Sequence, residues 1–279
     1  MKVVSFTFCL VLRRGKSYLA CSSYLSDRSL SSASSSSSND FDDFTLEKSS
    51  NDGPLQITFN QLKLEKPFCI DFINNKNRID RPREELVVKA VGKSDLVVDL
   101  TAGLGRDSML IASTGQRLCM IERNPTLYRL LYDGLYRYVQ TKSDLDASLY
   151  NIDSTNRTLV AEIVSKHFYK SPEELAIDKN ITVYLDPMYP SGLVGKSSLV
   201  KKETQVLHRL VGSTEGEDQS NNLLLFQSAI HIATSRIVVK RPIKSPPLCD
   251  IPPHNTIKGT KQRFDVYFMN RNIAMPKEL

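Results

Sequence analysis

Between residues 95 and 269 the sequence alternates short apolar segments with amphipathic ones, and this alternation restricts the possible folds more than any other feature. The apolar segments are rich in β-branched and aromatic residues, which predicts strands. They lie at 95–100, 117–122, 149–152, 181–186, 236–241, 255–259 and 263–269. Apolar residues at helical spacing predict helices at 106–113, 125–139, 199–211 and 223–234. The pattern predicts an α/β fold with a mainly parallel sheet, helices on both faces and a C-terminal antiparallel hairpin.

Ligands of such sheets bind at the carboxyl ends of the strands, so the residues after each strand are the candidates for a site. The first strand runs into "DLTAGLGRD", which extends from Asp99 to Asp107. Gly103 and Gly105 allow a tight turn and a close approach of the backbone to a ligand. The next helix begins near Arg106 and presents free N–H groups to whatever lies over the loop. An ordinary helix-entry turn is the alternative.

The second strand ends at Glu122, whose carboxylate is suited to accept hydrogen bonds from the two hydroxyls of a ribose. With the glycine loop, it predicts a cofactor that contains a nucleoside. Arg123 follows and is equally suited to the 2′-phosphate of NADP, so the pair alone leaves the cofactor open. An NADP-dependent reductase is the weakest alternative, because Ser108 stands where the dinucleotide fingerprint has its third glycine.

The third strand is followed by Asp153 and Ser154, which are placed to bind the edge of an adenine or to cap a helix. The fourth ends in Asp186-Pro187-Met188-Tyr189. In isolation, Asp-Pro is a common strand stop. For a base amine, however, Asp186 and the Pro187 carbonyl can accept its two N–H groups, while Tyr189 stacks on the ring.

Together these positions resemble the class I S-adenosylmethionine-dependent methyltransferases. The Asp186 segment is similar to their [DN]-P-P-[YF] motif, with methionine at the second proline. Longer segments, from about residue 55 to 268, resemble the RsmJ family of bacterial small-subunit (16S) ribosomal RNA guanine-N2 methyltransferases. They are "DLTAGLGRDSMLIASTGQRLCMIERNP", "YLDPMYP", "LVKKE", "IVVKRP" and "KGTKQRFDVY".

The resemblance implies a seven-stranded, Rossmann-like class I fold for residues 54–279 and a methyl transfer to the N2 amine of a guanosine. It implies cofactor contacts at Arg106, Asp107, Glu122, Arg123, Asp153, Ser154 and Asp186. Asp99, Gly103 and Gly105 join them as cofactor-binding candidates, and Asp186, Pro187 and Tyr189 are the catalytic candidates. The implied partner is ribosomal RNA or the small ribosomal subunit, and we expect a monomer.

Two alternatives remain. One is a methyltransferase for an amine of another nucleic acid or of a protein, and the other is a non-catalytic, RNA-binding ribosome assembly factor with this fold. The net charge of +6 lies entirely after residue 53 and favours polyanionic partners. The candidate phosphate contacts are Arg78, Arg81, Arg83, Lys196, Lys201, Lys202, Lys240, Arg241, Lys258, Lys261 and Arg263. Five cysteines without a CxxC pair indicate no metal site, and no apolar run reaches the length of a spanning helix.

Residues 1–53 differ in character from the rest. The first 26 residues carry four basic residues and no acidic one, and a serine tract follows at 29–38. This profile is typical of an organelle transit peptide, whereas a secretory signal is disfavoured because Arg13, Arg14 and Lys16 follow the apolar run. The segment through Gly53 is also low in complexity and too polar to pack, so we predict that residues 1–53 form a disordered, serine-rich extension; a disordered tail without a targeting role is the alternative. A transit peptide would place the protein in the mitochondrion or another organelle; otherwise we expect it in the cytoplasm.

Overall fold

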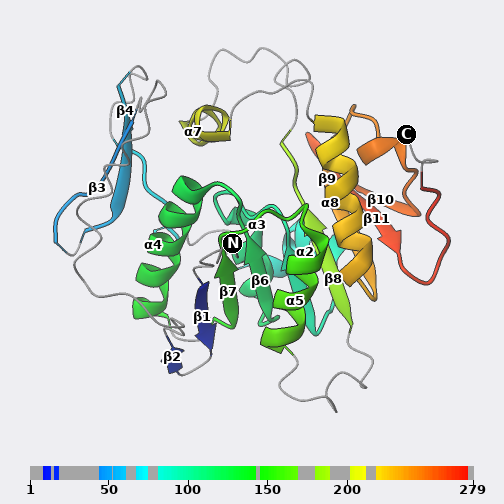
Figure 1. The fold of residues 1–279 in the computed structure, drawn as a ribbon, viewed down its shortest axis with the longest axis horizontal. Helices are drawn as coiled ribbons and strands as arrows, with labels where there is room; N and C mark the ends of the chain where they lie inside the picture. Colours follow the sequence, from blue (N-terminus) through cyan, green and yellow to red (C-terminus); the bar gives the residue numbers. More distant parts are fainter. Residues whose placement is uncertain are drawn as a thin grey trace, which may run out of the picture.

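The computed structural model describes residues 9–13, 16–18, 44–51, 53–60, 67–74, 81–142, 145–168, 180–188, 202–211 and 218–275. Its centre is a nine-stranded sheet in the order β10-β11-β9-β8-β5-β6-β7-β1-β2 (Figure 1). The seven strands of the predicted core are β5 (Leu96–Asp99), β6 (Leu118–Ile121), β7 (Ala147–Tyr150), β8 (Ile181–Leu185), β9 (Arg236–Pro242), β10 (Asn255–Lys258) and β11 (Gln262–Phe268).

The strand order reverses between β5 and β8. From β5 the chain moves outward through β6 to β7, and then returns to β8 on the other side of β5; all these pairs and β8–β9 are parallel. β11 pairs antiparallel with β9, and β10 with β11. The predicted parallel sheet and its C-terminal hairpin are therefore confirmed. The crevice over the carboxyl ends of β5 and β8 is the topological switch point, where such sheets bind ligands.

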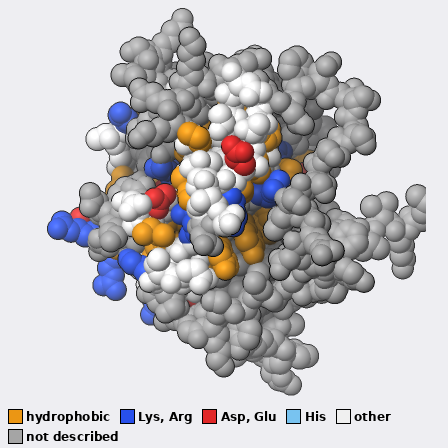
Figure 2. All heavy atoms as spheres, turned by 90° about the vertical axis from the view of Figure 1, so that its left-hand side faces the viewer, with side chains coloured by type: hydrophobic (Ala, Val, Ile, Leu, Met, Phe, Trp, Pro, Cys, Tyr) orange, Lys and Arg blue, Asp and Glu red, His pale blue; other side chains and the backbone are white. Residues whose placement is uncertain are grey.

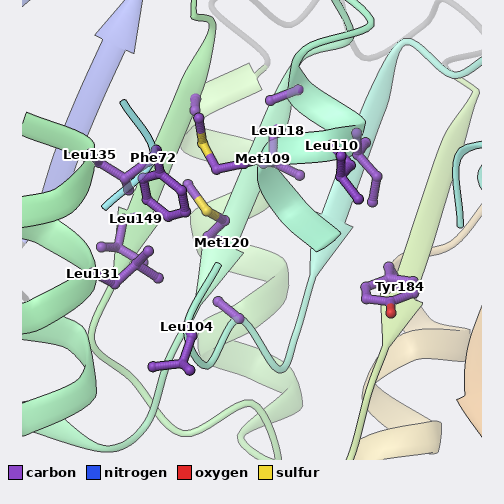
Figure 3. Close-up of a cluster of buried hydrophobic side chains, with 14 of the residues drawn as sticks. Phe72, Leu104, Met109, Leu110, Leu118, Met120, Leu131, Leu135, Leu149 and Tyr184 are labelled. Atoms are coloured by element: carbon purple, nitrogen blue, oxygen red, sulfur yellow. The ribbon is translucent and has the colours of Figure 1, made fainter. Parts of the chain in front are cut away.

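Helices cover both faces of the sheet. One face packs against α2 (Leu86–Val91), α3 (Arg106–Ala112), α4 (Pro125–Thr141) and α7 (Lys202–Val211). The other packs against α5 (Arg157–Phe168) and α8 (Asp218–Ile232). Side chains alternate along each strand, so Val97 faces the first layer and Val98 the second. Figure 3 shows the first layer, where Met109 of α3 lies close to Met120 of β6.

Two helices, α2 and α5, were not predicted, and neither were two short 3-10 turns, η1 (Pro82–Glu84) and η3 (Leu248–Asp250). Helix α2 has six residues, too few for a clear helical period, although four of them are buried. Helix α5 has a weak amphipathic pattern, and Asn156 caps its start by accepting a hydrogen bond from Leu159 N at 3.1 Å.

The prediction that residues 1–53 are disordered is wrong for three segments. β1 (Cys9–Arg13) pairs antiparallel with β7, and β2 (Lys16–Tyr18) extends the sheet from β1. β3 (Phe44–Lys48) pairs with β4 (Leu55–Phe59), so the predicted boundary at residue 53 falls inside a hairpin. Composition missed β1 because its partner β7 is distant in the sequence, and it missed β3 because the residues around this hairpin are polar. The serine tract lies outside the described residues.

A clamp on α4 holds β4 and the following segment against the core. Asp133 accepts hydrogen bonds from Leu55 N (3.0 Å) and Arg137 Nε (2.8 Å), and Arg137 Nη2 donates to the carbonyl of Ile70. Between them, Gly134 leaves room for Ile70, which a Cβ at this position would meet at 2.8 Å. The segment before the first parallel strand is thus bound to the helix that follows the second.

The loop after β5 is held from beneath by the buried carboxylate of Asp99, which is 2% exposed. Its Oδ1 accepts a hydrogen bond from Thr101 N (2.9 Å), and its Oδ2 accepts one from the hydroxyl of Ser108 in α3. Gly105 has a φ of 69°, and a Cβ there would lie 2.5 Å from Leu131 Cδ1. The loop therefore requires glycine at this position for both its backbone conformation and its packing.

Burial raises the pKa of Asp99 from its ordinary value of 3.8 to about 7, against the lowering effect of its hydrogen bonds. Because the folded state holds this proton more tightly than the unfolded state, the group's contribution to stability falls as the pH rises from about 4 to about 7. Asp99→Asn keeps the shape without the charge. We expect its melting temperature, relative to wild type, to rise across this interval and to level off above it; a constant difference from pH 4 to 8 would contradict the assignment.

Candidate active site

Three of the four predicted strand-end positions contact one loop, that between β5 and α3. Gly103 N donates to Glu122 Oε2 at 2.7 Å, Asp186 N donates to Thr101 Oγ1 at 2.7 Å, and Ser154 Oγ donates to the carbonyl of Leu100. The ends of β6, β7 and β8 therefore converge on the loop, as the switch-point rule predicts.

The loop turns at two glycines with positive φ, Gly103 and Gly105. Gly103 has a φ of 52°, and a Cβ there would meet nothing closer than Thr101 O at 3.8 Å and Leu207 Cδ2 at 4.0 Å. The glycine is thus not required by local crowding, in contrast to Gly105: a Cβ here would make only ordinary van der Waals contacts, so the positive φ is what favours glycine. Helix α7 lies beside both this loop and the start of α4. Its Leu207 is near Gly103, and its Leu210 carbonyl accepts a hydrogen bond from Asn124 Nδ2 at 2.8 Å.

Glu122 lies beside this loop and is 7% exposed. Its Oε2 accepts from Gly103 N and its Oε1 from Asn124 N at 2.8 Å, so each oxygen keeps a lone pair for a ligand. Burial raises the pKa of Glu122, while the two backbone hydrogen bonds and Arg123 lower it. Arg123 itself is exposed. The carboxylate is held in one orientation, as recognition of a ribose diol requires.

Asn124 and Asn151, which were not predicted as site residues, orient the Glu122 end of the site. Asn124 caps α4 by accepting hydrogen bonds from Thr126 N and Leu127 N, and Asn151 Nδ2 donates to the carbonyl of Glu122 at 2.7 Å. The Asn-Pro pair at the start of a predicted helix could have identified Asn124 as a helix cap. No local sequence pattern indicates the role of Asn151.

Asp153 and Ser154 have different environments. Asp153 is exposed and accepts hydrogen bonds from the backbone N and hydroxyl of Thr155, whereas Ser154 is buried beneath the loop. Neither caps α5, because Asn156 occupies that position. Asp153 is therefore open to a ligand, and Ser154 braces the loop. Arg106 is exposed at the first turn of α3.

The end of β8 carries an ion cluster. Lys240 Nζ donates to Asp186 Oδ2 at 2.8 Å and to Asp107 Oδ2 at 2.7 Å, and Tyr184 Oη also donates to Asp107 Oδ2 at 2.7 Å. Burial raises the pKa of Asp186, the charge of Lys240 lowers it, and that of Asp107 raises it. The two carboxylates raise the pKa of Lys240 against the effect of burial, so the lysine stays charged. Lys240 and Tyr184 were not predicted in these roles.

Of the proposed catalytic residues, Asp186 and Pro187 are described, and Tyr189 lies outside the described residues. In the described part of the chain, Asp186 Oδ1 accepts no hydrogen bond, and 34% of this side chain's surface is exposed. The cluster therefore presents one carboxylate oxygen to the site and keeps the other in an ion pair. That arrangement suits an acceptor of hydrogen bonds from an amine.

The candidate phosphate contacts whose side chains the structure describes divide into three groups. Arg241 and Arg263 are buried: Arg241 Nε donates to the Pro246 carbonyl, and Arg263 pairs with Asp265. Lys240 belongs to the ion cluster. Arg81, Arg83, Lys258 and Lys261 are exposed. The side chains of Arg78, Lys196, Lys201 and Lys202 lie outside what the structure describes.

Among the residues that the structure describes, no group of three His, Cys, Asp or Glu side chains is arranged to hold a metal ion. No helix in the described ranges is both long and apolar enough to cross a membrane. The site suits an organic cation that contains a nucleoside. It offers a glycine backbone without a side chain, a fixed carboxylate at the end of β6 and two carboxylates around one lysine.

Residues 35–269 match the family model described as "Putative SAM-dependent methyltransferase". Ribosomal RNA small subunit methyltransferase J of Salmonella typhi is 39% identical over 209 residues, which cover 71% of this chain and 75% of the relative. The Coxiella burnetii protein of the same name is 36% identical over 225 residues, 77% of this chain and 80% of the relative.

A solved structure agrees with the fold. The SAM-dependent methyltransferase NGO1261 from Neisseria gonorrhoeae aligns with a TM-score of 0.57 and 28% identity, covering 77% of this chain and 79% of its own. The resemblance found in the sequence, the class I fold and S-adenosylmethionine as the cofactor are thereby confirmed. The chain belongs to the RsmJ family of S-adenosylmethionine-dependent methyltransferases.

Proposed function

We propose that this protein transfers a methyl group from S-adenosylmethionine to the exocyclic N2 amine of a guanosine in small-subunit ribosomal RNA. The observation that carries the proposal is the open Oδ1 of Asp186 at the switch point, beside the cofactor loop. The name of the RsmJ relatives supports the choice of ribosomal RNA.

The residues of the loop and of the neighbouring strand ends hold the cofactor. Glu122 accepts hydrogen bonds from the ribose, Asp153 binds the adenine edge, and the backbone at Gly103 lies against the amino-acid part with Arg106 and Asp107 nearby. When bound, S-adenosylmethionine supplies an electrophilic methyl group on its sulfonium. Asp99 and Ser154 act from beneath, by fixing the loop that makes these contacts.

Asp186 acts on the amine. A guanine amine is a weak nucleophile because its lone pair is delocalised into the ring. Oδ1 of Asp186 and the Pro187 carbonyl accept its two N–H bonds, which localises the lone pair and aims it. Methylation obliges the nitrogen to release one proton. The carboxylate that already accepts this hydrogen is placed to take it, and its raised pKa favours that step.

Four exposed basic residues at the carboxyl edge of the sheet are the phosphate contacts in this proposal. The β10–β11 turn carries Lys258 and Lys261 and lies at this edge, because Gln262 pairs with Pro242 at the end of β9. A Cβ at Gly259 would lie 2.8 Å from Leu86 Cδ1, so the start of α2 is adjacent. Just before α2, Arg81 precedes η1 and Arg83 lies within it. Positive charge on this rim favours an RNA backbone entering beside Asp186.

The direct test uses the full chain with methyl-labelled S-adenosylmethionine and unmodified small-subunit RNA, both free and in assembled subunits. Nucleoside mass spectrometry should detect labelled N2-methylguanosine. Asp186→Ala should lower kcat by about 100-fold or more while changing cofactor affinity little. The variant should fold, because Lys240 keeps Asp107 as its partner.

Asp146→Ala is the matched control. It removes a carboxylate whose ion pair with Arg117 is partly exposed and lies just before β7, at the opposite edge of the sheet. Its kcat should equal that of wild type. Label in another nucleoside or in protein would redirect the proposal to another amine, and cofactor binding without any methylated product would favour an assembly factor.

Glu122→Gln tests the cofactor contacts. In the wild type, each carboxylate oxygen of Glu122 accepts a hydrogen bond from a backbone N–H group. The glutamine side chain has no negative charge, and its NH₂ group would face one of these N–H donors. We expect the dissociation constant for S-adenosylmethionine to rise about 10- to 100-fold in calorimetry. Glu47→Gln, on the exposed side of β3, should bind like wild type. An unchanged affinity in Glu122→Gln would remove the ribose assignment.

We also propose that residues 1–53 direct the protein to an organelle, where its substrate would be the organelle's own ribosomal RNA. The basic, acid-free start of the chain supports this. Cleavage that removes β1 and β2 would make β7 the edge strand in place of β2. A fluorescent fusion of residues 1–53 should enter mitochondria or another organelle, and a fusion that stays in the cytosol would overturn the proposal.

A further inference from the structure

We infer that Lys240 is a positioning residue for the methyl transfer: its ion pair with Oδ2 of Asp186 keeps the carboxylate oriented so that Oδ1 is directed at the substrate amine. This inference rests on the proposed function, because it assigns the partner of the proposed acceptor. It also changes the interpretation of Lys240, which the sequence presented as a phosphate contact.

The sheet register makes the two residues neighbours. Leu185 of β8 pairs in parallel with Val239 of β9, so Asp186 and Lys240 are the next residues on adjacent strands. Parallel pairing points their side chains to the same face. The lysine then needs only to extend over the strand ends to reach both Asp186 and Asp107, and it does so at 2.8 and 2.7 Å. Its side chain is 21% exposed, which leaves little of it available to a phosphate.

The two hydrogen bonds of Lys240 join the two halves of the site. Asp107 belongs to α3, which follows the cofactor loop, whereas Asp186 directly follows β8 and is the proposed acceptor of the amine. Tyr184 donates to the same oxygen of Asp107 as Lys240 does, so that carboxylate is fixed by two donors. Lys240 thereby anchors Asp186 to a rigid group. Rotation of the acceptor would break this ion pair.

The charged groups around Asp186 determine how its pKa would change if Lys240 were removed. Asp107 of α3 faces it, and Asp99 of β5 and Tyr184 of β8 sense its charge. Among the described residues that act on the pKa of Asp186, Lys240 is the only cation. Without it, burial and the charge of Asp107 would be opposed by no ion pair, and the pKa of Asp186 would rise further. The acceptor would then be protonated at a higher pH.

Lys240→Met and Lys240→Arg separate charge from position. In Lys240→Met we expect kcat to fall about 100-fold with little change in KM for RNA, and the acidic limb of the kcat–pH profile to move to higher pH. Lys240→Arg keeps the cation, so its acidic limb should stay near that of wild type while kcat falls from the altered geometry. Lys89→Met, on the exposed side of α2 near its C-terminus, is the matched control and should behave like wild type.

A second readout requires no RNA. The ¹³C carboxyl titration of Asp186, assigned by its absence in Asp186→Ala, should shift to higher pH in Lys240→Met and not in Lys89→Met. An unchanged titration would overturn the inference, and so would a raised KM with unchanged kcat and pH profile, which would make Lys240 a phosphate contact. Loss of folding in both Lys240 variants would show a structural role instead. If wild type methylates no RNA, the proposed function fails, while the titration still decides the ion pair.

Discussion

The buried carboxylate of Asp99 is the interaction on which the site depends. It binds the backbone of Thr101 at one end of the loop and the hydroxyl of Ser108 at the other, and so fixes the loop in one conformation. Glu122, Ser154 and the backbone of Asp186 then attach to that loop from three different strands. Because each of these contacts is a single hydrogen bond, their combined precision depends on the loop being rigid. The cost is a carboxyl group buried away from water.

Charge balance explains how the carboxylates around the loop coexist. Asp107 and Asp186 share Lys240, while Asp99 relies on neutral donors and has a pKa near 7. The remaining excess of negative charge is compatible with a sulfonium-bearing cofactor, which brings positive charge to the same place. One lysine thus stabilises the site before the cofactor binds, without cancelling the field that favours the cofactor.

The parts of the site that depend on local sequence were predictable, and those that depend on distant pairing were not. The glycine loop, Glu122 and Asp186 follow strands with clear apolar patterns, so their convergence followed from the rule for parallel sheets. Strand β1 was missed because its pairing partner β7 is distant in the sequence, and β3 because it lies between polar segments. Lys240 was found as a basic residue at a strand end, but its role required the register between β8 and β9, which no local pattern specifies.

The register also explains why basic residues close together in the sequence have unlike roles. Arg263 pairs with Asp265 through two nitrogens and donates to the carbonyls of Pro242, Ile243 and Ser245, which fixes the turn directly after β9. That turn in turn fixes the end of the strand that carries Lys240. The buried arginine thus supports the lysine, and the lysine supports Asp186. The exposed lysines of the β10–β11 turn are left for solvent and ligands. The burial of each side chain, and not its position in the sequence, therefore decides its role. Buried Arg263 stabilises the turn, partly buried Lys240 orients Asp186, and the exposed lysines are available to bind RNA.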